Sequence, residues 1–130
     1  MKQVTAAIWI RDGKVFIAKR PAGDKLQDKW EFPGGKLEVG ETPEECLRRE
    51  MFEEFGIDVD VGDFFERSIY TYETGCIELL AYFVRCCSGR VGVHAHDEVF
   101  WAEPAELDMF DFAPADIPLV SALKKYLKRR

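Results

Sequence analysis

One segment in the middle of the chain carries the start and stop signals of an α-helix. Thr42 is a favourable N-cap, Pro43 suits the first helical position, and Glu45, three residues after Thr42, completes a capping box. Gly56 fits the left-handed residue at which many helices stop. We therefore predict a helix that starts after Thr42 and ends near Phe55.

Three glutamates of this helix share one face. Glu50, Glu53 and Glu54 are spaced i, i+3 and i+4, so they project from the same side. The neighbouring stripe on the helix is apolar: Leu47, Met51 and Phe55. The helix is therefore expected to pack on the core with its acidic face at the rim. Taken alone, such a pattern is more often a solvated charged face, but a divalent cation would also remove the repulsion of about 0.2–0.5 kcal/mol per pair.

The loop before the helix favours the metal interpretation. Gly34 and Gly35 can adopt φ > 0 and bring a backbone carbonyl close to a ligand. Glu41 returns a fourth carboxylate to the same end of the helix, and the guanidinium of Arg49 can hold a carboxylate in place. Hard oxygen ligands on a rigid element suit Mg²⁺ or Mn²⁺.

The rest of the chain has the pattern of strands around two helices. The predicted strands are residues 4–10, 14–19, 57–61, 68–72, 77–86 and 99–102. The turn signal Asp12–Gly13 makes a hairpin of the first two. Helical spacing of apolar residues from about Asp116 predicts a second helix near the C-terminus. We expect an α/β layered domain around a mixed sheet, with residues 1–130 forming one domain.

Composition limits the partners that this chain can have. The net charge of -6 argues against a nucleic-acid polymer, which needs a basic footprint. A small polyphosphate needs none, because a bound metal supplies the positive charge locally. The basic residues at the C-terminus are expected to serve a helix end. No segment suits a bilayer span or a cleaved leader, so we expect a cytoplasmic protein without a membrane partner.

The four cysteines are expected to be reduced packing residues, since none forms a C-x-x-C pair. A zinc site with His94 and His96 is a weak alternative that the cysteine spacing does not support.

The helix and its preceding loop resemble a known motif. The run Gly35-x5-Glu41-x7-Arg49-Glu50-Met51-x-Glu53-Glu54-x-Gly56-Ile57 is similar to the Nudix box, G-x5-E-x7-R-E-U-x-E-E-x-G-U, where U is bulky and apolar. No position departs from the pattern. The resemblance implies a Nudix α/β/α sandwich and a Mg²⁺-dependent attack of water on a nucleoside diphosphate-linked substrate, with Mn²⁺ as a substitute ion.

The resemblance also implies roles for individual residues. Glu53, Glu54 and the carbonyl of Gly34 would hold the metal, and Glu50 would orient or deprotonate the water beside it. Arg49 would fix the carboxylates, and Glu41 would lie at the edge of the cluster. This division of labour suits phosphoryl displacement, which depends on positioning and charge neutralisation.

Further features point to one branch of the family. The segment Trp30–Lys36 and the small size resemble the MutT-like branch, which hydrolyses nucleoside triphosphates to monophosphate and pyrophosphate. Proline motifs of the ADP-ribose and NADH types are absent, and residues 112–119 are similar to bacterial CTP pyrophosphohydrolases. The alternatives are another nucleoside diphosphate-linked substrate, such as a nucleotide sugar or a dinucleotide, and a non-catalytic nucleotide-binding module. We expect a monomer or homodimer that acts on a small nucleotide.

Asp116 is the candidate base-reading residue, because 8-oxo-dGTP enzymes of this branch place an asparagine amide there. An ionised carboxylate only accepts hydrogen bonds. It would favour a base edge that donates, such as the cytosine N4 amino group or N7–H of 8-oxoguanine, and would oppose the guanine O6 unless Asp116 is protonated. The alternative role is an N-cap on the last helix.

Four more residues are candidates with structural alternatives. Arg20 matches an arginine that contacts nucleotide in relatives, but it also suits a solvated strand end. Phe32 can stack on a base or fill the core, and Lys36 can neutralise phosphate or lie in solvent. Glu98 is the candidate for an additional metal-binding loop carboxylate, with Asp97 competing for that role and an ordinary charged turn as the alternative.

Overall fold

The computed structural model describes residues 1–92, 96 and 98–129. His94 and Asp97, named above, lie outside the described residues. Within these ranges the helices and strands are β1 (Lys2–Arg11), β2 (Lys14–Lys19), β3 (Trp30–Glu31), α1 (Pro43–Phe55), β4 (Asp58–Tyr72), β5 (Gly75–Ser88), β6 (Glu98–Ala102) and α2 (Ile117–Lys128), with short 3₁₀ helices at Pro104–Met109 and Pro114–Asp116. None of the helices in these ranges is long and apolar enough to cross a membrane.

The strands form one mixed sheet. Its order is β3-β2-β1-β5-β4, and β6 pairs with β2. β1 runs parallel to β5, with Ala6 opposite Ala81, and the other pairs are antiparallel. The predicted hairpin is confirmed: Asp12 and Gly13 have φ of 53° and 76°, which is the left-handed conformation that a tight two-residue turn requires.

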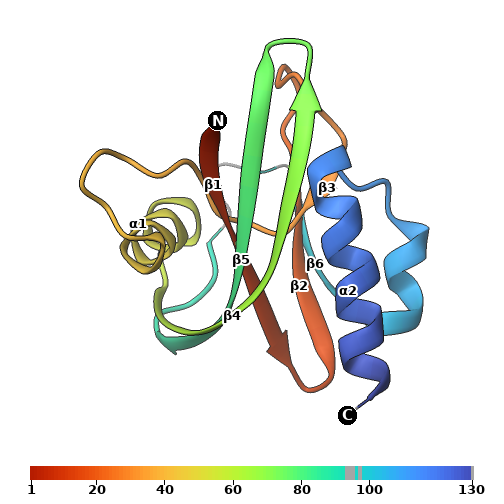
Figure 1. Ribbon diagram of the computed structural model, residues 1–130. Coiled ribbons are helices and arrows are strands. Elements are labelled where there is room, and N and C mark those ends of the chain that lie inside the picture. Colours follow the sequence, from red (N-terminus) through yellow and green to blue (C-terminus); the bar gives the residue numbers. More distant parts are fainter. Residues whose placement is uncertain (93–95, 97, 130) are drawn as a thin grey trace.

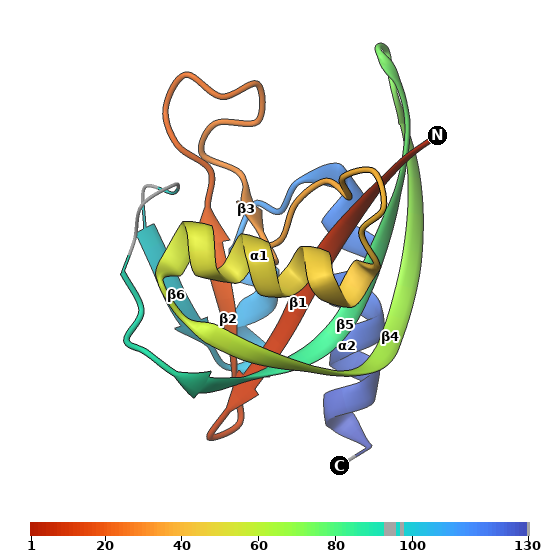
Figure 2. The same ribbon diagram turned by 90° about the vertical axis from the view of Figure 1, so that its left-hand side faces the viewer.

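The two helices cover opposite faces of the sheet (Figures 1 and 2). Alternate residues of β1 divide between the two cores, as strand geometry dictates. Ala7 and Trp9 pack on the α1 side, whereas Ala6 and Ile8 pack on the α2 side. The α1 side contains Leu47, Met51 and Phe55, and the α2 side contains Leu119, Val120 and Leu123. The predicted α/β/α sandwich is therefore confirmed.

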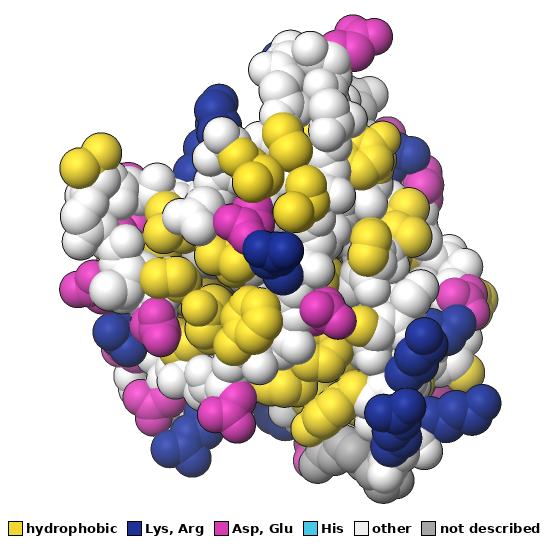
Figure 3. Space-filling view, in the orientation of Figure 1, with side chains coloured by type: hydrophobic (Ala, Val, Ile, Leu, Met, Phe, Trp, Pro, Cys, Tyr) yellow, Lys and Arg dark blue, Asp and Glu magenta, His cyan; other side chains and the backbone are white. Residues whose placement is uncertain are grey.

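Helix α1 begins and ends as predicted. The Thr42 side chain accepts the Glu45 amide, the Glu45 side chain accepts the Thr42 amide, and Gly56 ends the helix at φ 71°. At the C-terminal end of α2, the last turn carries Lys125 and Lys128, which suits the carbonyl end of a helix. Figure 3 shows basic side chains gathered over this end of the molecule.

Two features differ from the prediction. Residues 58–72 form one continuous strand, because register shifts between Val61 and Phe64 and between Phe64 and Glu66 let it bend without losing its pairing to β5. Between β2 and α1, where no strand was predicted, lies the two-residue strand β3, which pairs with β2 and bridges Trp30 to Phe112. A strand this short has no periodicity of its own to detect.

Candidate active site

The loop before α1 is fixed to the edge of β1. The Ala7 amide donates to the Pro33 carbonyl at 2.7 Å, and the Thr5 amide donates to the Gly35 carbonyl at 2.8 Å. The Gly34 carbonyl between them receives no hydrogen bond from any residue that the structure describes. It is therefore free to take a ligand.

The two glycines of this loop are needed for space. A Cβ on Gly34 would lie 2.0 Å from the Thr5 carbonyl oxygen, and one on Gly35 would lie 2.1 Å from Glu50 Oε1. Neither glycine has a positive φ, so the expectation of a left-handed conformation is wrong. Glycine is required at these two positions because the backbone of Thr5 lies against Gly34 and the side chain of Glu50 lies against Gly35.

Arg49 lies at the centre of the box carboxylates. Its Nε and Nη2 donate to Glu41 at 2.6 and 3.0 Å, and its Nη1 donates to Glu50 at 3.1 Å and to Glu53 at 3.4 Å. The guanidinium lowers the pKa of Glu41 to about 2. Arg49 thus places one positive charge among three carboxylates and reduces the repulsion between them.

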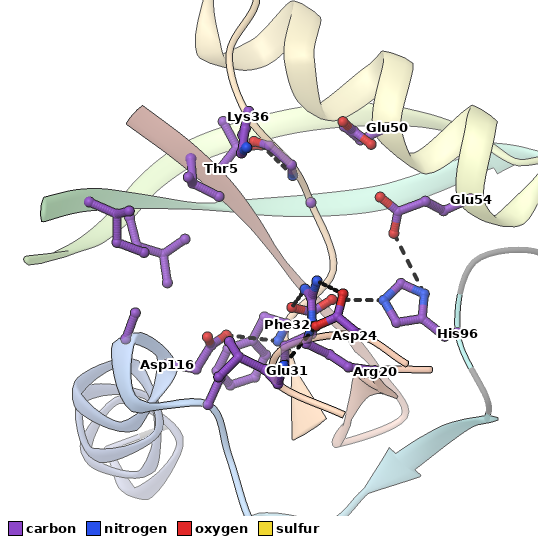
Figure 4. A pocket seen from close by; sticks show the side chains of 18 of the residues that line it. Thr5, Arg20, Asp24, Glu31, Phe32, Lys36, Glu50, Glu54, His96 and Asp116 are labelled. Atoms are coloured by element: carbon purple, nitrogen blue, oxygen red, sulfur yellow. Dashed lines mark hydrogen bonds and ion pairs between the residues drawn. The ribbon is translucent and has the colours of Figure 1, made fainter. Parts of the chain in front are cut away.

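A cavity of about 430 Å³ opens between α1 and the C-terminal segment (Figure 4). Glu50 and Glu54 lie on its α1 side, and Arg20, Glu31 and Asp116 lie on the opposite side. The volume is in the range of small-molecule sites. Glu53 is not among the described residues that line it, and its half-exposed side chain stays beside Arg49.

Glu54 is the unusual member of the box. Its Oε1 is buried and has no hydrogen-bond partner in the described part of the chain. Burial, followed by the hydrogen bond and charge of the neighbouring Glu50, raises the pKa of Glu54. A buried carboxylate without a partner is costly, which suits a cation ligand.

The residues present fit a hard divalent cation by their chemistry. A free carbonyl at Gly34, a buried orphan oxygen on Glu54 and the cavity-lining Glu50 are oxygen donors from two adjacent elements. Over residues 1–92, 96 and 98–129, no three His, Cys, Asp or Glu side chains converge closely enough to hold an ion as they stand. Arg49 currently takes the charge of Glu50 and Glu53.

A network of polar side chains that the sequence did not predict connects the two sides of the cavity. Arg20 donates to both carboxylate oxygens of Asp24, at 2.8 and 2.6 Å, and to Glu31 at 2.7 Å. Arg20 lowers the pKa of Asp24 to about 2. The other oxygen of Glu31 lies 2.7 Å from His96 Nε2. An acidic residue between two apolar ones, Trp30 and Phe32, is the sequence signal that could have identified Glu31. His96 lies in a connection between strands that has no recognisable sequence pattern.

Asp116 lies buried at the base of the cavity, with 5% of its surface exposed. Its Oδ2 accepts the Phe32 amide at 3.0 Å, and no cap hydrogen bond from its side chain to α2 is found in the described structure. The N-cap alternative is therefore wrong. Burial, followed by the charge of Glu31, raises the pKa of Asp116 well above its ordinary value of 3.8. Burial therefore favours the protonated form of Asp116, the form in which the carboxyl does not oppose the guanine O6.

This burial predicts a pH-dependent stability. A carboxyl whose pKa is raised by folding contributes stability below its ordinary pKa, and that contribution is lost as pH rises through the folded pKa. Asp116→Asn has no proton to lose, so its melting temperature should gain on that of the wild type as pH rises above about 3.8. Thermal melts across pH measure the difference. Asp63→Asn, at an exposed aspartate, is the matched control, and a flat difference for Asp116→Asn would contradict the burial argument.

The structure does not support two other predicted contacts. Glu98 is exposed and lies 3.6 Å from Lys19, opposite which it pairs in the sheet, and it is absent from the described lining of the cavity. Side chains alternate along β6, so Val99 and Trp101 pack on the α1 side of the sheet and Glu98 faces the other way. Phe32 is 2% exposed and stacks on Phe112 with ring centroids 5.4 Å apart, so one face of its ring packs in the core, and the residue also borders the cavity. Lys36 is exposed and borders the cavity.

All four cysteines are free thiols, as expected: Cys46, Cys76, Cys86 and Cys87. Cys46 is buried in the box, where its thiol contacts Thr5 and the Gly35 carbonyl.

Comparison with known proteins agrees with this geometry. The chain is 39% identical over 122 residues to the CTP pyrophosphohydrolase of Escherichia coli K12, covering 94% of this chain and 90% of that protein. It is 37% identical over 123 residues to the 8-oxo-dGTP diphosphatase of Haemophilus influenzae, covering 93% and 90%. The solution structure of the E. coli ORF135 protein superposes with a TM-score of 0.87 at 36% identity, covering 100% of this chain and 93% of that one.

The family model described as the NUDIX domain matches residues 1–123, which include the whole box and both sides of the cavity. Members of this family generally use divalent metal ions. With the box complete, the sandwich formed and the carboxylate helix at a cavity, the chain belongs to the Nudix hydrolase family.

Proposed function

We propose that this protein hydrolyses a nucleoside triphosphate to nucleoside monophosphate and pyrophosphate, with Mg²⁺ as its ion and Mn²⁺ as a substitute. The observation that carries the proposal is the cavity itself: Glu50 and Glu54 line one side and the buried Asp116 lines the other. The relatives named for CTP pyrophosphohydrolase and 8-oxo-dGTP diphosphatase activity support it. We place the protein in the cytoplasm as a monomer or homodimer.

The box residues divide the work on the phosphate side. The bound ion supplies Lewis acidity and an activated water. Gly34, Glu53 and Glu54 would hold the ion. Glu50 borders the cavity and is placed to orient a water molecule. Arg49 holds the carboxylates of Glu41 and Glu50 in position through its hydrogen bonds. Lys36, exposed at the cavity edge, would neutralise phosphate charge.

The base side offers a donor and an acceptor together. A neutral Asp116 presents a hydroxyl that donates and an oxygen that accepts. Cytosine offers the N3 acceptor beside the N4 donor, and 8-oxoguanine offers O6 beside N7–H, so both base edges match the same carboxylic acid. The conflict between guanine O6 and an ionised carboxylate disappears when Asp116 keeps its proton. We therefore propose CTP, or a modified dCTP, and 8-oxo-dGTP as substrates of one site.

The products test the reaction. With a panel of nucleoside triphosphates and Mg²⁺, phosphorus NMR is expected to show monophosphate and pyrophosphate, with the highest kcat/KM for cytosine and 8-oxoguanine nucleotides. EDTA should stop turnover, and added Mg²⁺ or Mn²⁺ should restore it. Orthophosphate as the only initial product, or full turnover in EDTA, would rule the proposal out.

A further inference from the structure

The imidazole of His96 is fixed in place although it belongs to the connection between β5 and β6. Its side chain is 4% exposed. The ring stacks nearly parallel on Phe55 of α1, with centroids 5.5 Å apart and an interplanar angle of 10°. Nε2 lies 2.7 Å from the Glu31 carboxylate. The stack sets the plane of the ring and the Glu31 contact sets its rotation, so the direction of Nδ1 is determined.

Nδ1 points at the box glutamate Glu54 (Figure 4). It lies 3.6 Å from Glu54 Oε1, which is too long for a normal hydrogen bond. Within the described residues these two atoms are the buried side-chain polar atoms that have no hydrogen-bond partner. Unsatisfied buried polar groups are rare in folded proteins and need a reason. Here the two unpaired atoms, His96 Nδ1 and Glu54 Oε1, face each other at the edge of the cavity.

The other end of the imidazole is anchored on the nucleotide side. Glu31 binds both His96 and Arg20, and Arg20 is held in turn by Asp24. Glu31 and Arg20 have 14% and 30% of their side chains exposed, so the chain of contacts is largely shielded from water. His96 therefore lies between a charge-paired network and the box carboxylate that, among the described residues, Arg49 does not hold.

We propose that His96 is a positioning residue: its Nε2–H donates to Glu31, its Nδ1–H faces Glu54, and together these contacts keep the Glu54 carboxylate aimed at the cavity for metal binding. The inference rests on the proposed metal-binding role of Glu54. A glutamate side chain turns about three bonds. Arg49 restrains Glu41, Glu50 and Glu53, but among the described residues it forms no hydrogen bond or ion pair with Glu54. Partners behind a metal ligand fix its orientation, and their removal typically costs about 10–100-fold in metal affinity.

Three substitutions separate packing from positioning. His96→Phe keeps a flat ring against Phe55 and removes both nitrogens. His96→Asn keeps a polar group near the position of Nδ1, and His96→Gln keeps one near Nε2. The measurement is the dissociation constant of Mn²⁺, taken from the EPR signal of the free ion without nucleotide, with thermal melts in EDTA to show that each variant is folded.

We expect His96→Phe and His96→Gln to bind Mn²⁺ about 10–100-fold more weakly, and His96→Asn to stay close to the wild type. Equal affinity in all three variants would overturn the positioning role, as would a ¹⁴N coupling to bound Mn²⁺ in the wild type, which would put His96 on the ion. The comparison of Asn with Gln stands even if the Phe variant does not fold. A wild type that binds no Mn²⁺ would instead refute the metal-binding role of Glu54.

Discussion

Glu54→Gln is expected to lower kcat by about 10²–10³-fold, the usual effect of removing one preorganised charge-stabilising group. Glu53→Gln should also lose most activity. Neither change should unfold the protein: Glu53 is half-exposed, and a glutamine at position 54 removes an ionisable group from a buried site. Initial rates of pyrophosphate release at saturating Mg²⁺, with melts in EDTA, measure the two effects separately.

Glu44→Gln is the matched control for these variants. Glu44 lies in the first turn of the same helix and is not among the described residues that line the cavity. Its variant should keep wild-type activity. Undiminished turnover by Glu54→Gln would remove Glu54 from the metal site, and equal losses in all three variants would mean that overall helix charge, rather than position, governs the rate.

The second large effect is expected at Asp116. Asp116→Leu should lower kcat/KM for cytosine and 8-oxoguanine nucleotides about ten- to hundredfold, because it leaves a base edge and the Phe32 amide unmatched at a cost of about 1–3 kcal/mol. Asp116→Asn should stay close to the wild type, since an amide also pairs a donor with an acceptor. Metal dependence should persist in both variants.

The pH dependence distinguishes a neutral from an ionised Asp116. Because folding raises the pKa of Asp116, its donor is present at low pH and is lost as pH rises through that value. The ratio of kcat/KM for Asp116→Asn to that for the wild type should therefore grow with pH. If Asp116→Asn instead moves preference from CTP toward 8-oxo-dGTP at every pH, the carboxylate is ionised when nucleotide is bound.

The parts of the site that the sequence predicted depend on local chemistry. The capping box at Thr42 and the stop at Gly56 fix α1, and helical spacing then places Glu50 and Glu54 at one rim. These signals lie within fifteen neighbouring residues, so no tertiary contact is needed to interpret them. The sheet followed from alternation and turn signals, although the bulged middle of β4 hid its continuity.

The parts that were missed depend on contacts between distant segments. His96 meets Glu31 across 65 residues, and Asp116 meets Phe32 across 84. Burial decides whether Asp116 is ionised, and burial is a property of the fold. Glu98 had a suitable charge and a suitable place in the sequence, but side-chain alternation along β6 places it on the face opposite the α1 core.

The short strand β3 has a consequence for how such a protein can change. Trp30 exchanges hydrogen bonds with Asp111 and Ala113, Glu31 meets His96, and the Phe32 amide meets Asp116, just before the loop with the free Gly34 carbonyl. Consecutive residues thus contact the C-terminal segment, the network behind the box and the buried Asp116. Inserting one residue into the stretch from Trp30 to Gly34 would turn the residues that follow to the opposite face of the strand, and these contacts would be lost together. Divergence in base preference is therefore expected to proceed by substitution in the C-terminal segment, with the length of this stretch held constant.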